Sequence, residues 1–210
     1  MTVAQGIVLA VLWMSWCAVH SLLIDTSVSS WVKVRQPRLV CWYRLLYNGL
    51  ALATFLPLAA YTHLLDGGVV FRWPGWGGAL ARILLLGTAL LLFRGGARLY
   101  DFRSFLGIDQ LRQGNSSVLL STNHGFLPVG VFGITRHPWY LGSLLTIWSV
   151  FENYPQPIVI AAGILSLYLV IGTLLEERKI LHEYGDSYRR YQGQVSMLFP
   201  WKWLKKLLTG

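Results

Sequence analysis

The chain has 210 residues, the length of about one domain, and its composition excludes an ordinary soluble protein. Apolar residues make up 54% of it and charged residues only 13%, whereas soluble domains carry about 25% charged residues. The net charge of +9 comes from basic residues separated by long neutral segments, which is not the pattern of a nucleic-acid-binding protein. The sequence therefore predicts an all-α integral membrane protein with no nucleic-acid partner.

Five segments are candidates for membrane-spanning helices. A bilayer core about 30 Å thick needs roughly 20 helical residues. The stretch 83–93 is short, but Arg82 and Arg94 extend it to about 79–99 because their side chains can reach the headgroups. The first segment lacks a basic start and a small-x-small cleavage site, so we expect a span and not a cleaved leader. The other candidates are 1–24, 45–65, 138–153 and 157–175, all free of Asp, Glu, Lys and Arg except for Glu152 near the end of 138–153.

The last two candidates are expected to form a tight helical hairpin, 138–175. Pro138 stands at a helix start, where proline is tolerated, and Pro155 and Pro157 interrupt the chain between the two segments. We expect one membrane domain, 1–210, with three spans in 1–100. Its second part, 101–210, would hold a loop, the hairpin and a helical tail that completes a cofactor pocket.

The basic residues predict the orientation of the chain. Sixteen of the eighteen Lys and Arg residues lie in the alternate loops 25–44, 94–136 and 176–210. Since cytoplasmic loops are enriched in Lys and Arg, the N-terminus is expected outside and the C-terminus in the cytoplasm. The localisation expected from this pattern is a bacterial inner membrane, with the active site on its cytoplasmic face.

The segment 201–208 is basic and aromatic, and it is too short to span a bilayer. Its pattern is typical of an interfacial anchor, and capture of a lipid substrate is the alternative.

Two charged groups flank the predicted hairpin. Arg136 and His137 stand at the start of its first helix, whose N-terminus carries the positive end of a dipole and suits a carboxylate or phosphate. Glu176 and Glu177 follow 23 residues without charge. Because the helices of a hairpin are antiparallel, these two groups must lie near each other. Facing charges of opposite sign suit a zwitterionic amino acid moiety. The histidines show no metal-ligand spacing, so no metal site is predicted.

The stretch His124–Gly142, HGFLPVGVFGITRHPWYLG, resembles the pattern H-x-L-V-x-x-G-x-Y-x-x-x-R-H-P-x-Y-x-G of the isoprenylcysteine carboxyl methyltransferase superfamily, which includes phospholipid methyltransferases. The stretch 176–195 looks like that superfamily's E-E-x-x-L-x-x-x-[FY]-G-x-x-Y-x-x-Y-x-x-x-V. In the N-terminal half, the stretches 16–21 (WCAVHS) and 43–48 (YRLLYN) look more like bacterial NnrU-type proteins and methanethiol S-methyltransferases. The resemblance covers about 124–200.

The resemblance implies a membrane enzyme that uses S-adenosylmethionine. We predict Arg136 and Glu177 as catalytic residues: Glu177 would pair with the ammonium of the cofactor's methionine part, and the helix N-terminus near Arg136 would receive its carboxylate. Phe132 replaces the usual tyrosine, and Thr173 stands where prenylcysteine enzymes carry an arginine, which argues against a prenylcysteine substrate. The residues that the resemblance implies in cofactor binding are His124, Gly125, Phe126, Leu127, Phe132, His137, Pro138, Trp139, Tyr140 and Glu177, and we add Gly130 and Glu176 to the predicted cofactor site.

The predicted function is methyl transfer from S-adenosylmethionine to a small or lipid-soluble thiol, carboxylate or amine, which enters from the lipid bilayer. In such a reaction, proximity and desolvation can supply much of the catalysis. Two alternatives stay open at this point. Membrane sterol reductases that use NADPH carry a similar R-H-P-x-Y-x-G, and a transporter or assembly protein would be non-enzymatic.

Overall fold

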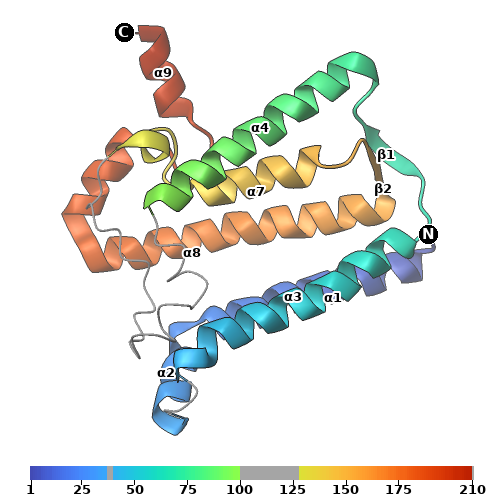
Figure 1. Ribbon diagram of the computed structural model, residues 1–210, viewed down its shortest axis with the longest axis horizontal. Coiled ribbons are helices and arrows are strands. Elements are labelled where there is room, and N and C mark those ends of the chain that lie inside the picture. The colour runs from blue at the N-terminus through green and yellow to red at the C-terminus, as the bar shows by residue number, and fades with distance from the viewer. Residues whose placement is uncertain (37–39, 100–127, 210) are drawn as a thin grey trace. The chain divides into compact units, whose positions relative to one another are not determined.

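The computed structural model describes residues 1–36, 40–99 and 128–209 (Figure 1). This part of the chain is mainly helical, with one 3-10 turn (η2) and two short strands that pair with each other. The chain divides into two compact units. The elements in chain order are α1 (Val3–Ile24), α2 (Thr26–Arg35), α3 (Val40–Leu64), β1 (Val69–Arg72), α4 (Gly75–Leu99), η2 (Gly130–Gly133), α7 (Pro138–Ser149), β2 (Asn153–Pro155), α8 (Gln156–Gln194) and α9 (Trp201–Thr209).

Four of the described helices are long and apolar enough to cross a membrane: α1, α3, α4 and α8. They lie where the sequence predicts spans, so the expectation of a helical membrane protein is supported. The remaining candidate is α7, whose 12 residues give a length of about 18 Å, short of a bilayer core. The count of five spans therefore stays a prediction.

The first unit contains α1, α2, α3 and the start of α8, residues 156–165. Its core centres on Leu9, Trp13 and Ala161. The Trp13 indole donates a hydrogen bond to the Thr62 hydroxyl at 3.1 Å, and the Trp16 indole donates to Thr54 at the same distance. The later tryptophan on α1 thus pairs with the earlier threonine on α3, so the two helices run antiparallel.

In the second unit, α4 and α7 pack closely because Gly96 lets an indole approach the backbone. A Cβ atom at Gly96 would lie 2.2 Å from Nε1 of Trp139. That nitrogen donates to the Phe93 carbonyl at 3.2 Å. At the other end of the pair, Arg82 Nε donates to the Ser149 carbonyl at 3.0 Å. The helices α4 and α7 are therefore antiparallel, and a side-chain-to-backbone hydrogen bond joins them at each end.

The second unit also contains the parts of the predicted hairpin next to its charged ends, residues 138–153 and 166–175. The Trp148 indole on α7 donates to Ser166 on α8 at 2.9 Å. Nearer the start of α7, the ring of Tyr140 lies beside Gly172 on α8. A Cβ atom at Gly172 would be 3.4 Å from that ring. These pairs run in opposite directions along α7 and α8. The antiparallel packing brings the N-terminus of α7 beside the middle of α8, which is where the charged residues lie.

Candidate functional site

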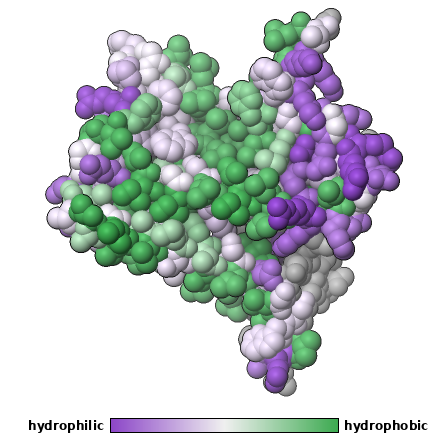
Figure 2. Space-filling view, turned by 180° about the vertical axis from the view of Figure 1, so that it is seen from behind, coloured by the Kyte–Doolittle hydropathy of each residue, from purple (hydrophilic) through white to green (hydrophobic). Residues whose placement is uncertain are grey.

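The charged groups that flank the hairpin meet at one corner of the second unit. Arg136 and His137 directly precede α7, and Glu176 and Glu177 lie where α8 changes from apolar to polar sequence. Figure 2 shows hydrophilic side chains gathered over the C-terminal part of α8. The distance between Arg136 Nη2 and Glu177 Oε2 is 2.6 Å, so the predicted meeting of these two groups is found in the structure.

The carboxylate of Glu177 is the centre of this corner. Arg136 donates to it through two nitrogens, from Nε to Oε1 at 2.9 Å and from Nη2 to Oε2 at 2.6 Å. Nε2 of His137 lies 2.7 Å from Oε1, and the amide of Gln192 donates to Oε2 at 2.7 Å. The hydroxyl of Tyr188 also donates to Oε1. A carboxylate has about four lone-pair sites, so these donors occupy Glu177 fully.

The Arg136–Glu177 pair is buried, with 8% and 10% of the two side chains exposed. Burial alone would raise the pKa of Glu177, but hydrogen bonds from His137, Arg136, Tyr188 and Gln192 outweigh it and hold that pKa well below its ordinary value of 4.5. Burial and the hydrogen bond to Glu177 raise the pKa of the Tyr188 hydroxyl. The corner therefore holds an ionised carboxylate and a protonated phenol at neutral pH.

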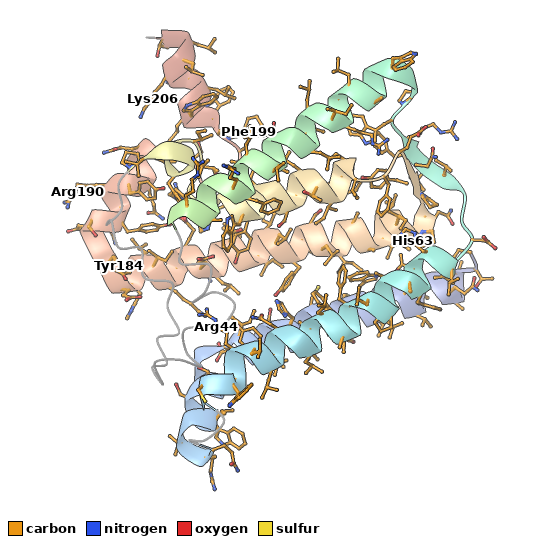
Figure 3. All side chains as sticks on the ribbon, viewed as in Figure 1. Arg44, His63, Tyr184, Arg190, Phe199 and Lys206 are labelled. Atoms are coloured by element: carbon orange, nitrogen blue, oxygen red, sulfur yellow. The ribbon has the colours of Figure 1, made fainter. Side chains whose placement is uncertain are left out.

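A kink at Gly185 brings part of this network together. Gly185 has φ of 52° and ψ of −126° inside α8, a conformation that residues with a side chain rarely adopt. In a straight helix Tyr188 would lie about 16 Å further along the axis than Glu177, and Gln192 about 22 Å. The kink folds the end of α8 back, so that both side chains reach the carboxylate. Tyr184 and Arg190 lie on either side of the kink (Figure 3).

The segment Gln192–Met197, which comprises the last residues of α8 and the turn that follows them, holds the start of α7 in place. The backbone N–H of Arg136 donates to the Ser196 carbonyl at 2.9 Å, and the hydroxyl of Thr135 donates to the Met197 carbonyl at the same distance. Arg136 Nη1 also donates to the Val195 carbonyl at 2.5 Å. The guanidinium is therefore fixed by one carboxylate and by this turn.

Glu176 differs from Glu177 in its surroundings. Its side chain is 34% exposed, and its Oε2 lies 3.7 Å from Nδ1 of His137. Arg136 balances the charge of Glu177, which leaves the corner with a second, more accessible carboxylate beside an imidazole and the N-terminus of α7. Such an arrangement can bind a ligand that carries an ammonium and a carboxylate.

The other residues predicted in the site have different positions. His124, Gly125, Phe126 and Leu127 lie outside the described residues. Gly130 opens η2 with φ of 55°, and Phe132 is buried with its carbonyl accepting from Tyr191 at 2.8 Å. Pro138 begins α7, and the Tyr140 ring contacts His137 edge-on at 5.6 Å. The indole of Trp139 packs on α4 and donates to it.

The structure places three further residues in the corner that the sequence motifs do not indicate: Tyr188, Gln192 and Ser196. The sequence pattern of 176–192 predicts one helix, and along one helix these residues lie far from Glu177. Gly185, in the middle of that pattern, is the signal that could have indicated a break.

The chain matches no model of a protein family and no solved structure. It is similar to proteins named methanethiol S-methyltransferase. One from Bradyrhizobium diazoefficiens is 36% identical over 72 residues, covering 34% of this chain and 25% of the relative. One from Pseudomonas deceptionensis is 31% identical over 128 residues, covering 61% of this chain and 43% of the relative. One from Mycobacterium tuberculosis is 34% identical over 80 residues, covering 38% and 32%.

The matched part of the chain thus spans less than half of the length of these three relatives. Their shared name indicates a methyltransferase, the class that the two motifs predict. The chain is therefore similar in sequence to methanethiol S-methyltransferases, and this similarity supports its resemblance to the isoprenylcysteine carboxyl methyltransferase superfamily.

Proposed function

We propose that the chain transfers a methyl group from S-adenosylmethionine to a small thiol, at the cytoplasmic face of a bacterial inner membrane. The observation that carries the proposal is the corner in which His137 and Glu176 lie beside the paired Arg136 and Glu177. The relatives named methanethiol S-methyltransferase favour a thiol as the acceptor over a carboxylate or an amine. The cytoplasmic location rests on the distribution of basic residues.

The residues of the corner fit the methionine part of this cofactor. Glu176 offers a partly exposed carboxylate to an ammonium group, and the N-terminus of α7 offers its positive dipole end to a carboxylate. The rings of Tyr140 and His137 lie edge to face beside them, and an aromatic face can attract a cation. When bound, S-adenosylmethionine supplies a methyl group on a positively charged sulfur.

Arg136 and Glu177 act as positioning residues in this proposal. The sequence predicts both as catalytic residues, with Glu177 pairing with the cofactor's ammonium. In the structure the oxygens of Glu177 are occupied by five donor atoms of the chain itself. We therefore assign the ammonium to Glu176, and to Glu177 the task of holding Arg136, His137 and Tyr188 in place.

The chain's part in the reaction is to bind, orient and exclude water. A thiol reacts as its thiolate, so it loses its proton to solvent before it meets the methyl group. The negative charge of the thiolate and the positive charge of the donor then cancel as the new bond forms. A site shielded from water favours that cancellation, and correct orientation removes much of the remaining barrier.

The test is to measure binding of S-adenosylmethionine by calorimetry, and transfer of a labelled methyl group to methanethiol, with the full chain in nanodiscs. We expect Glu176→Gln to weaken binding by about ten-fold without changing thermal stability, because one charge-assisted contact is lost. Glu183→Gln, an exposed carboxylate on the same helix, is the matched control and should bind like wild type.

Two results would contradict the proposal. If wild type binds no S-adenosylmethionine, the cofactor is wrong. If Glu176→Gln binds as tightly as Glu183→Gln, the assignment of the ammonium to Glu176 is wrong, whatever the acceptor is.

A further inference from the structure

The C-terminal helix α9 has an apolar side that the described part of the chain leaves exposed. Trp201 is 66% exposed, and Leu208 is 87% exposed. With about 3.6 residues per turn, the apolar and polar residues separate onto two sides of the helix. The apolar side consists of Trp201, Trp203, Leu204, Leu207 and Leu208, and the polar side of Lys202, Lys205, Lys206 and Thr209.

The charge and chemistry of α9 indicate what covers its apolar side. Aromatic rings beside lysines are typical of helices that lie in the headgroup layer of a membrane, and lysines there are attracted to anionic lipids. Figure 2 shows both hydrophobic and hydrophilic side chains on this helix, and Figure 3 shows Lys206 on it. Within its unit, α9 runs across the direction of α8, as a helix in the plane of the membrane would (Figure 1).

The attachment of α9 places it at the right depth. The backbone N–H of Lys202 donates to Oγ of Ser196 at 2.9 Å, and its Nζ donates to the carbonyls of Gln192 and Gly193 at 2.5 and 3.0 Å. These groups belong to the turn that holds Arg136. That turn lies beside Glu177, just where the apolar part of α8 ends, so α9 starts at the expected boundary between lipid and water.

The same attachment connects α9 to the candidate site. The Ser196 side chain accepts from Lys202, while its carbonyl accepts from Arg136. The Gln192 carbonyl accepts from Lys202 and, at 3.4 Å, from Arg136 Nη1. A contact that orders α9 therefore also orders the turn around Arg136.

We propose that α9 docks on the anionic surface of a phospholipid bilayer, with its apolar side among the acyl chains, and that Lys202 links this contact to the corner of Arg136 and Glu177. The proposal concerns a surface and its support of the corner, and it holds whichever reaction the corner performs.

Docking is tested with a bimane label on the full chain, in which Cys17 and Cys41 are replaced by serine. The label is placed at the apolar side by Leu208→Cys or at the polar side by Thr209→Cys, and the protein is put in nanodiscs with or without phosphatidylglycerol. We expect lipid-borne nitroxides to quench the label at 208, and aqueous iodide to quench the label at 209. Phosphatidylglycerol should strengthen the protection at 208, and Lys205→Gln with Lys206→Gln should abolish that gain.

Equal access of iodide to both labels would overturn the docking. So would protection at 208 that depends on the number of chains per disc and not on lipid, because a second copy would then be the occupant. If the protection at 208 depends neither on phosphatidylglycerol nor on Lys205 and Lys206, the proposal that the docking surface is anionic is wrong.

The link through Lys202 is tested by hydrogen exchange in discs with phosphatidylglycerol. Lys202→Met removes the contacts of Nζ but keeps the backbone bond to Ser196. We expect the amides of Arg136 and His137 to exchange about five-fold faster, while the label at 208 stays protected. Unchanged exchange at these two amides would overturn the link.

Discussion

Glu177 shows how one buried carboxylate can hold together four residues from two segments of a chain. It receives hydrogen bonds from Arg136 and His137 before α7, and from Tyr188 and Gln192 after the kink in α8. Removing one partner of a buried ion pair is costly because the other charge stays buried without compensation. Glu177 is therefore expected to matter for stability as well as for binding.

Replacing Glu177 by alanine should destabilise the second unit by about 3–5 kcal/mol, because the guanidinium of Arg136 would lose its only described counter-charge. Unfolding of the full chain in detergent, followed by its circular dichroism, measures this change. Glu183→Ala, an exposed position on the same helix, should change stability by less than about 0.5 kcal/mol. Equal losses in the two variants would contradict the role given to Glu177.

The pKa of Glu177 also predicts how stability depends on pH. Because the pKa lies below its ordinary value in the folded protein, the carboxylate contributes fully above about pH 4.5 and less as the pH falls through the folded-state pKa. As the pH is lowered from about 4.5, the melting temperature should therefore fall. In Glu177→Gln, which cannot ionise there, the drop should be shallower. A slope identical to that of wild type would show that other groups cause the acid sensitivity.

At the scale of elements, two glycines decide how the second unit is assembled. Gly185 lets α8 fold back on itself, and Gly96 lets α7 approach α4. Both α8 and α7 would still be helices without these glycines, but the side chains that they bring to the corner would be displaced.

We expect Gly185→Ala to destabilise the protein by about 1–3 kcal/mol, because alanine is strained at the positive φ of the kink. Thermal unfolding measures the change, and hydrogen exchange should show faster exchange of the turn Gln192–Met197. Gly163→Ala is the matched control on α8, since nothing lies within 4 Å of a Cβ there. A kink variant as stable as this control would mean that the helix can straighten freely.

Gly96→Ala should cost about 1–3 kcal/mol, because its Cβ would collide with the indole of Trp139. Gly87→Ala on the same helix has open space around its Cβ and should be neutral or slightly stabilising. Combining Gly96→Ala with Trp139→Ala should cost less than the sum of the two single changes. Additive costs would exclude a direct clash between these residues.

At the scale of the whole molecule, the number of spans decides where the two termini lie. Four described helices are long enough to cross a membrane, and α7, with 12 residues, is the fifth span that the sequence predicts. An odd number of spans places the termini on opposite sides, and an even number places them on the same side. The basic residues favour a cytoplasmic C-terminus in either case.

We expect the N-terminus outside and the C-terminus in the cytoplasm, as five spans require. A Thr2→Cys variant without Cys17 and Cys41 should react with an impermeant maleimide on intact cells, whereas Thr209→Cys should react only after lysis. Reaction of both positions only after lysis would contradict five spans and indicate four.

The sequence by itself determined the membrane class, the places of the long helices and the meeting of Arg136 with Glu177. These follow from composition, from charge-free runs and from the antiparallel geometry of a hairpin, all of which are local properties. Only the tertiary structure decided that Tyr188 and Gln192 join the corner, and that Glu177 is saturated by them. The reason is that the kink at Gly185 and the turn after α8 bring together residues that a regular helix would hold far apart.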